Sequence, residues 1–178
     1  MENDDILSWS KDHLLKWSDF NAESNPSAFE DSSGHIQFHY TWTVNSDMSK
    51  EKINFLINEI KLTTQFFRHL SWVRENQSSL DLLKHEQGHF DLAESLRPGI
   101  TEKIQNAFQN KKFLTRGKNP EQQKQFARED SGLMISKELE KWSLDFAQKR
   151  KKYDDETEFG HNAKKQKEYD EEFDKLRK

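Results

Sequence analysis

The sequence contains no cysteine, and only three prolines and six glycines among its 178 residues. Without cysteine the chain has no disulfide, no cysteine-based zinc site and no thiol nucleophile, so histidine and carboxylate side chains must hold any bound metal. No stretch approaches the roughly 20 apolar residues of a membrane-spanning helix, and we predict no membrane partner. The acidic start, MENDDILSWS, lacks the apolar segment of a secretory leader. We therefore expect a cytoplasmic protein if the chain is full length, and an exported one if a leader has been removed.

The composition combines few apolar residues with many charged ones. Hydrophobic residues make up 32% of the chain and charged residues 34%, a balance typical of long solvated helices around a small core. Five tryptophans and 13 phenylalanines argue against a wholly disordered chain, because disordered segments are poor in aromatic residues. The net charge of −4 gives no electrostatic footprint for nucleic acid, so we predict no nucleic-acid partner. The length fits one domain, expected to span residues 1–178.

The first part of the chain carries the strand signals. Residues 35–44, HIQFHYTWTV, alternate apolar or aromatic side chains with more polar ones, which predicts a half-buried strand. Residues 63–73, TTQFFRHLSWV, predict a second strand with a less regular alternation. Between them a helix is predicted over residues 48–61 from apolar residues at helical spacing, namely Ile53, Leu56, Ile57 and Ile60. Residues 1–75 are therefore expected to be mainly strands with one helix.

Helix signals dominate after residue 78. A helix over 78–97 is expected to begin at a serine cap, Ser78 or Ser79, and to end near Arg97 because a proline and a glycine follow. The remaining chain is expected to be a helical part, residues 100–178, with helices over 101–114, 121–154 and 164–178. The predicted fold class is α+β, with a small sheet packed on the helix of 78–97 and long C-terminal helices after it.

Residues 82–94, LLKHEQGHFDLAE, hold two histidines four positions apart. On a helix, residues at this spacing lie about 40° apart around the axis and one turn along it, so His85 and His89 can bind the same metal ion. Glu86 lies beside the first histidine on an adjoining face, where its carboxylate can accept a proton from the water that the metal activates. The motif therefore predicts two zinc ligands, His85 and His89, and a general base, Glu86.

A catalytic zinc usually has three protein ligands and one open position, and the motif supplies only two. Glu94 lies nine residues beyond His85, about 180° round the same helix, so it can reach the metal only if the helix unwinds. Asp154 and His161 lie near the end of the helix predicted over 121–154, where a turn can bring a side chain to the metal. His161 is also a candidate donor to the oxyanion of the reaction. From the residues alone, all three stay open as the third ligand.

The motif resembles the signature of a bacterial domain-of-unknown-function family described as predicted secreted zinc-dependent proteases. Further segments resemble blocks of this family in the same order, namely LLKWSDF near the start, HIQFHYTW, FRHLSWV and YDDETEFGHNAKKQKEYDEEF near the end. The resemblance covers most of the chain apart from roughly residues 110–135.

The resemblance implies a minimal zincin-like fold with one Zn²⁺ per chain, His85 and His89 as ligands, and Glu86 as the catalytic base. Asp154 matches the aspartate of the family's YD pair, which makes it the preferred third ligand. The family block tends to read YDxxTxHG, and Phe159 stands here in the place of its histidine, with a histidine only at His161.

The leading hypothesis is a zinc-dependent metallopeptidase that acts on a peptide or protein substrate. Two alternatives belong to other functional classes. One is a zincin-like protein without activity that serves as a binding or scaffold module. The other is a helical interaction protein in which the motif arose by accident, which the low apolar content and the charged C-terminal segments would suit.

Overall fold

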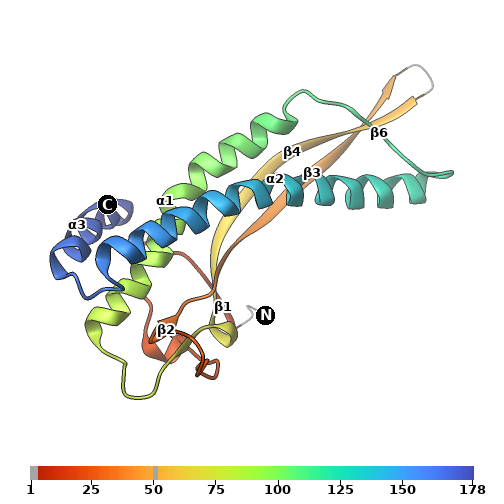
Figure 1. The fold of residues 1–178 in the computed structure, drawn as a ribbon. Helices are drawn as coiled ribbons and strands as arrows, with labels where there is room; N and C mark the ends of the chain where they lie inside the picture. The colour runs from red at the N-terminus through yellow and green to blue at the C-terminus, as the bar shows by residue number, and fades with distance from the viewer. Residues whose placement is uncertain (1–3, 50–51) are drawn as a thin grey trace. The chain divides into compact units, whose positions relative to one another are not determined.

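The computed structural model describes residues 4–49 and 52–178 (Figure 1). Helices take 51% of the chain and strands 22%, so the fold class is α+β as predicted. The elements, with η for a 3₁₀ helix, are β1 (Ile6–Ser8), η1 (Trp17–Asp19), β2 (Ser32–Ser33), β3 (Ile36–Ser49), β4 (Lys52–Phe67), η2 (Arg68–Leu70), β5 (Trp72–Val73), α1 (Leu80–Phe108), β6 (Phe113–Leu114), α2 (Pro120–Thr157), α3 (Ala163–Phe173) and η3 (Asp174–Arg177). The strands form one sheet in the order β1-β4-β3, in which β6 also pairs with β4, and a separate pair of β2 and β5.

The chain divides into two compact units. Unit 1 consists of Met1–His39, Thr63–Arg97 and Phe146–Lys178. In this unit β1 pairs antiparallel with the end of β4, and the ring of Phe66 on β4 lies 5.8 Å from that of Phe90 on α1. Its buried apolar core comprises Leu15, Phe20, Ile36, Phe38, Phe66, Phe90, Leu92, Ala93, Phe146, Tyr153 and Phe173.

Unit 2 consists of Tyr40–Leu62 and Pro98–Asp145. Within it, Gln105 of α1 donates a hydrogen bond to the carbonyl of Ile60 on β4 at 2.9 Å. On the α2 side, Trp42 of β3 donates to the hydroxyl of Ser131 at 2.8 Å. Its buried apolar core comprises Phe55, Ile57, Ile60, Leu62, Ile100, Ile104, Phe108, Ala127, Ile135 and Leu139.

The strand predicted over 35–44 is confirmed as part of β3, but the helix predicted over 48–61 is wrong. Its described residues belong to β3 and β4, and residues 50–51 lie outside the described chain. The apolar residues have helical spacing because the alternation of buried and exposed side chains along β4 shifts by one residue. Phe55 and Ile57 are buried first, and Ile60 and Leu62 follow. Between them Glu59 has a left-handed backbone, with φ 50°, which indicates an extra residue of the β-bulge type. One inserted residue turned a period of two into an apparent period of three to four.

The single strand predicted over 63–73 is divided among three elements in the structure. Residues 63–67 are the end of β4, a 3₁₀ turn follows as η2, and only Trp72–Val73 form the short strand β5. The adjoining phenylalanines of this segment lie at the end of β4, where Phe66 is fully buried and Phe67 is half-buried.

The helix with the motif does not end near Arg97 as predicted, because α1 continues through Pro98 and Gly99 to Phe108. A proline inside a helix costs about 3 kcal/mol, since it removes a hydrogen bond and crowds the preceding turn. Burial of Ile100, Ile104 and Phe108 at four-residue spacing continues the apolar face of the helix and offsets that cost. The helix predicted over 101–114 is thus the last part of α1, followed by strand β6.

The C-terminal helices agree with the predictions. The helix expected over 121–154 is α2, Pro120–Thr157, and the helix expected over 164–178 is α3, continued by η3. The turn between α2 and α3 has three successive residues with positive φ, namely Glu158, Phe159 and Gly160. Among the described residues, no helix is long and apolar enough to cross a membrane.

Two glycines of α1 allow a matched test of the packing next to the motif. A Cβ atom on Gly88 would lie 2.0 Å from the hydroxyl oxygen of Tyr153, whereas one on Gly99 would have no neighbour within 4 Å. We expect Gly88→Ala to lower the free energy of unfolding by about 1–3 kcal/mol through overpacking. Gly99→Ala should raise it by about 0.5–1 kcal/mol, because alanine loses less backbone entropy in a helix. Thermal unfolding of the metal-free proteins measures both, and equal shifts would contradict this packing.

Candidate metal centre

Helix α1 carries the motif into the interior of unit 1. Ser79 caps the helix as one of the two predicted serines, and its hydroxyl accepts a hydrogen bond from the backbone nitrogen of Leu82 at 3.1 Å. His85 and His89 are only 2% and 3% exposed, and their ring centroids lie 4.7 Å apart. The spacing of four places both imidazoles on one face of the helix, as the sequence predicted, and this face is buried.

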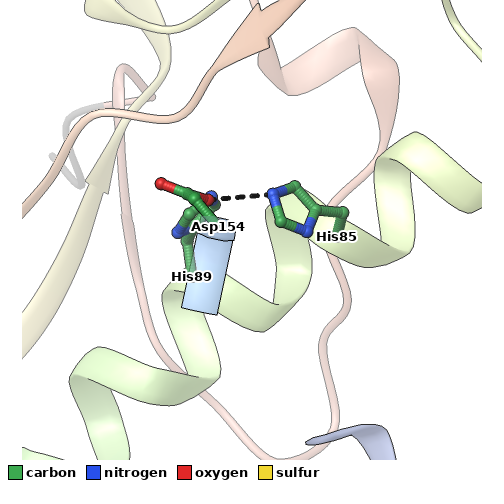
Figure 2. A group of neighbouring side chains, drawn as sticks. All are labelled: His85, His89 and Asp154. Carbon is green, nitrogen blue, oxygen red and sulfur yellow. Dashed lines mark hydrogen bonds and ion pairs between the residues drawn. The ribbon is translucent and has the colours of Figure 1, made fainter. Parts of the chain in front are cut away.

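Asp154 near the end of α2 reaches the same point from the opposite helix. Its Oδ1 lies 3.1 Å from Nε2 of His85 and 3.0 Å from Nε2 of His89, and Figure 2 shows the carboxylate beside the two rings. One ligand atom from each of the three residues lies within 4.8 Å of the others. Three ligands at 2.0–2.1 Å around a tetrahedral zinc ion are roughly 3.4 Å apart, so the group needs little change to hold one. That it binds zinc stays a prediction.

Gln166 on α3 determines which nitrogen of His85 faces Asp154. The side-chain nitrogen of Gln166 donates to Asp170 and to the hydroxyl of Tyr153, both at 2.8 Å, so its oxygen faces Nδ1 of His85 at 3.1 Å. Because an amide oxygen only accepts hydrogen bonds, Nδ1 carries the proton. In a neutral imidazole, Nε2 then has a free lone pair directed at Asp154.

This hydrogen-bond pattern brings two acceptors face to face. The lone pair of His85 Nε2 and the carboxylate oxygen of Asp154 lie 3.1 Å apart, a distance at which two acceptors repel unless a cation or a proton lies between them. In His89, Nδ1 is buried without a hydrogen-bond partner among the described residues, and Nε2 lies 3.0 Å from Oδ1 of Asp154. The donor set of two imidazoles and a carboxylate is one that Zn²⁺ prefers. The residues present therefore fit a zinc ion.

The ionisation states of the group also suit a metal. Burial lowers the pKa of His89 to about 4, and the positive charge of Arg150 acts in the same direction, so the imidazole is neutral at pH 7. Burial by itself would raise the pKa of Asp154, but the two adjoining histidines, His85 and His89, outweigh it and hold this pKa below its usual value. Neutral imidazole and ionised carboxylate are the forms that bind metals.

Glu86 is buried beside the group, with both carboxylate oxygens held in place. Oε1 accepts a hydrogen bond from the Ser32 hydroxyl at 2.6 Å, and Oε2 accepts one from the backbone nitrogen of Gly34 at 2.9 Å. Each oxygen keeps a further lone pair. Glu86 lines the same cavity of about 1340 Å³ as the three candidate ligands, so the expected base is within reach of a molecule bound there.

The other candidate ligands lie elsewhere. Glu94 accepts a hydrogen bond from Thr64 at 2.7 Å and pairs with Arg97 at 2.7 Å, and it is not part of the group. His161 lies on the turn after α2, exposed to solvent on the wall of the cavity, and it is not part of the group either. Of the three candidates from the sequence, only Asp154 is brought to the two histidines.

The sequence analysis did not predict several residues of the site. Tyr153 stacks on the His85 ring at 4.7 Å and donates to the carbonyl of His85 at 3.1 Å. Thr157, one helical turn later, lies 3.3 Å from Nδ1 of His85. Both belong to the segment YDDET that resembles the family block, which was the only available hint. Ser32 and Gly34 sit in a short segment without any chemical pattern.

The contact from Gln166 gives a prediction about metal affinity. Gln166→Leu should weaken zinc binding by about 10–100-fold, because residues that orient a metal-binding histidine contribute about this factor. Competition against a chelating dye measures the change in affinity. Gln125→Leu is the matched control, since Gln125 is exposed and its side chain donates a hydrogen bond to Glu129 in the same helix. Equal zinc affinity in wild type and Gln166→Leu would show that this hydrogen bond does not orient His85.

Comparison with known protein families, curated proteins and solved structures finds no match to this chain. The resemblance to the zinc-dependent protease family therefore stays a prediction that depends on the sequence blocks alone.

Proposed function

We propose that the chain is a zinc-dependent metallopeptidase of zincin-like fold, with one Zn²⁺ per chain, that hydrolyses peptide bonds. The observation that carries the proposal is the convergence of Nε2 of His85, Nε2 of His89 and Oδ1 of Asp154 at one point. Without a metal, acceptor atoms lie close together at this point. With a cation, the three side chains form a three-ligand site that leaves one position open for water or substrate.

The chemistry of the proposal divides between the ion and the side chains. A Zn²⁺ ion would polarise the substrate carbonyl and lower the pKa of a water molecule to about 7. Glu86 takes a proton from the attacking water while the water oxygen bonds to the carbonyl carbon, and it delivers that proton to the leaving nitrogen as the C–N bond breaks. The hydrogen bonds from Ser32 and Gly34 hold the Glu86 carboxylate in one orientation for both transfers.

The size of the cavity suits a peptide or protein substrate. Its volume of about 1340 Å³ exceeds the roughly 300–1,000 Å³ of a small-molecule pocket. The exposed aromatic side chain of Phe29 lies at its wall, 5.7 Å from the ring of Phe159, and the wall also carries charged and uncharged polar side chains. Such a wall offers both apolar and polar contacts to an extended chain.

The test of this function is hydrolysis of unfolded casein by the zinc-loaded protein, with Glu86→Gln as the variant that removes the base. Products are identified by mass spectrometry and zinc content is measured on each sample. A wild type that holds zinc but cleaves nothing would point to a binding module without activity.

A further inference from the structure

Arg150 is the cationic side chain held next to the proposed catalytic base. It precedes Asp154 by one turn of α2, so both side chains leave the helix on the same face, and both line the cavity. Its Nη1 donates a hydrogen bond to the carbonyl of Gly34 at 3.1 Å. The backbone nitrogen of Gly34 in turn donates to Glu86. The backbone of Gly34 therefore binds both the guanidinium of Arg150 and the carboxylate of Glu86.

In the part of the chain that the structure describes, Arg150 forms no ion pair, so no neighbouring carboxylate neutralises its charge there. Many acidic side chains nevertheless line the cavity, namely Glu30, Asp31, Asp81, Asp155, Glu158 and Asp170. The hydrogen bond of Arg150 to Gly34 uses one of five N–H donors. The remaining donors of a half-buried guanidinium are available to an anion in the cavity.

The charge is also close enough to act at the candidate metal centre. Arg150 lies one turn before the candidate ligand Asp154 on α2 and lines the same cavity as His85 and His89. The other cationic side chains of the cavity wall, Lys84 and Lys167, are exposed, and Lys167 lies 3.9 Å from Glu171. Arg150 is therefore the cation best placed for negative charge that develops near the histidines.

We propose that Arg150 is a further catalytic residue, whose guanidinium donates a hydrogen bond to the oxyanion formed on the substrate carbonyl. This inference rests on the proposed function. As water adds to the carbonyl carbon, the π electrons of the C=O bond move to oxygen, and Arg150 stabilises that charge until the C–N bond breaks and the carbonyl reforms. The sequence analysis considered His161 as the donor to the oxyanion. We assign this role to Arg150 instead, because the side chain of His161 is exposed at the cavity wall.

The test compares Arg150→Lys and Arg150→Met with Lys84→Met, which removes an exposed cation of the same cavity wall. All proteins are loaded with zinc, and their zinc content and far-UV circular dichroism are recorded. We expect Arg150→Met to retain zinc and fold while kcat falls about 10²–10³-fold, the usual cost of one oxyanion donor. Arg150→Lys should recover part of the loss, because it keeps the charge but not the fork of donors. Lys84→Met should stay within a few-fold of wild type.

A binding measurement separates this role from the proposed function. A phosphinic peptide imitates the tetrahedral oxyanion, and its affinity for Arg150→Met should fall by a factor similar to that of kcat. Wild type that binds the phosphinic peptide no more tightly than the matching amide would overturn the proposed function itself. Tight binding that is equal in wild type and Arg150→Met would overturn only the role of Arg150.

A second substrate pair tests whether Arg150 instead binds a C-terminal carboxylate. Peptides with free and with amidated C-termini should lose kcat/KM equally in Arg150→Met, because both form the same oxyanion. A loss confined to the free carboxylate would overturn the oxyanion role and assign Arg150 to recognition of the chain end.

Discussion

Glu86→Gln is expected to keep one equivalent of zinc and to lose hydrolysis by about 10²–10⁴-fold, the contribution of a positioned general base. Zinc should remain because Glu86 bonds to Ser32 and Gly34 and is not one of the three converging ligands. The amide has nearly the shape of the carboxylate but no basic oxygen, so it cannot take the proton of the attacking water. The loss should therefore appear in kcat, with little change in metal content.

The matched control is Glu94→Gln, a change of the same kind at another buried carboxylate of α1. Glu94 contacts Thr64 and Arg97 and not the histidines, so its loss should affect stability and leave zinc content and kcat nearly unchanged. The assay is cleavage of unfolded casein or a peptide library, with zinc measured on the same samples. Full hydrolysis by Glu86→Gln would assign the activity to a contaminant or to another site.

His89→Ala and Asp154→Ala are expected to abolish the stabilisation of the protein by zinc. A ligand that binds only the folded state at 1,000 times its Kd adds about 4 kcal/mol to the free energy of unfolding. For a chain of this length, that corresponds to a rise of roughly 8–16 °C in Tm. The two variants remove the atoms that converge with Nε2 of His85, so zinc should not raise their Tm.

The control for these variants is Asp155→Asn, next to the proposed ligand. Asp155 is exposed and forms an ion pair with Lys151 at 2.6 Å, so this variant should keep the full shift. Calorimetry with zinc and with chelator gives the shift for each protein, and elemental analysis gives zinc per chain. A zinc-dependent rise in Tm that survives in Asp154→Ala would mean that a different residue supplies the third ligand.

Local features of this chain were determined by the sequence itself. The spacing of His85 and His89 places two imidazoles on one helical face wherever that helix lies, because a residue turns about 100° around a helix axis. The alternation after His35 predicted β3 for the same kind of reason, since successive side chains of a strand point to opposite faces. Such patterns depend only on backbone geometry over a few residues.

Features that combine distant segments were decided only by the tertiary structure. Asp154 lies 69 residues after His85, and Gln166 81 residues after it, and no periodicity relates such positions. The extra residue at Glu59 and the passage of α1 through Pro98 both oppose the local pattern, and each is accepted because the flanking apolar side chains are buried. Their cost is local, whereas the burial that offsets it depends on the packing of whole elements. That packing also brings the third candidate ligand, the held carboxylate of Glu86 and the guanidinium of Arg150 to one cavity.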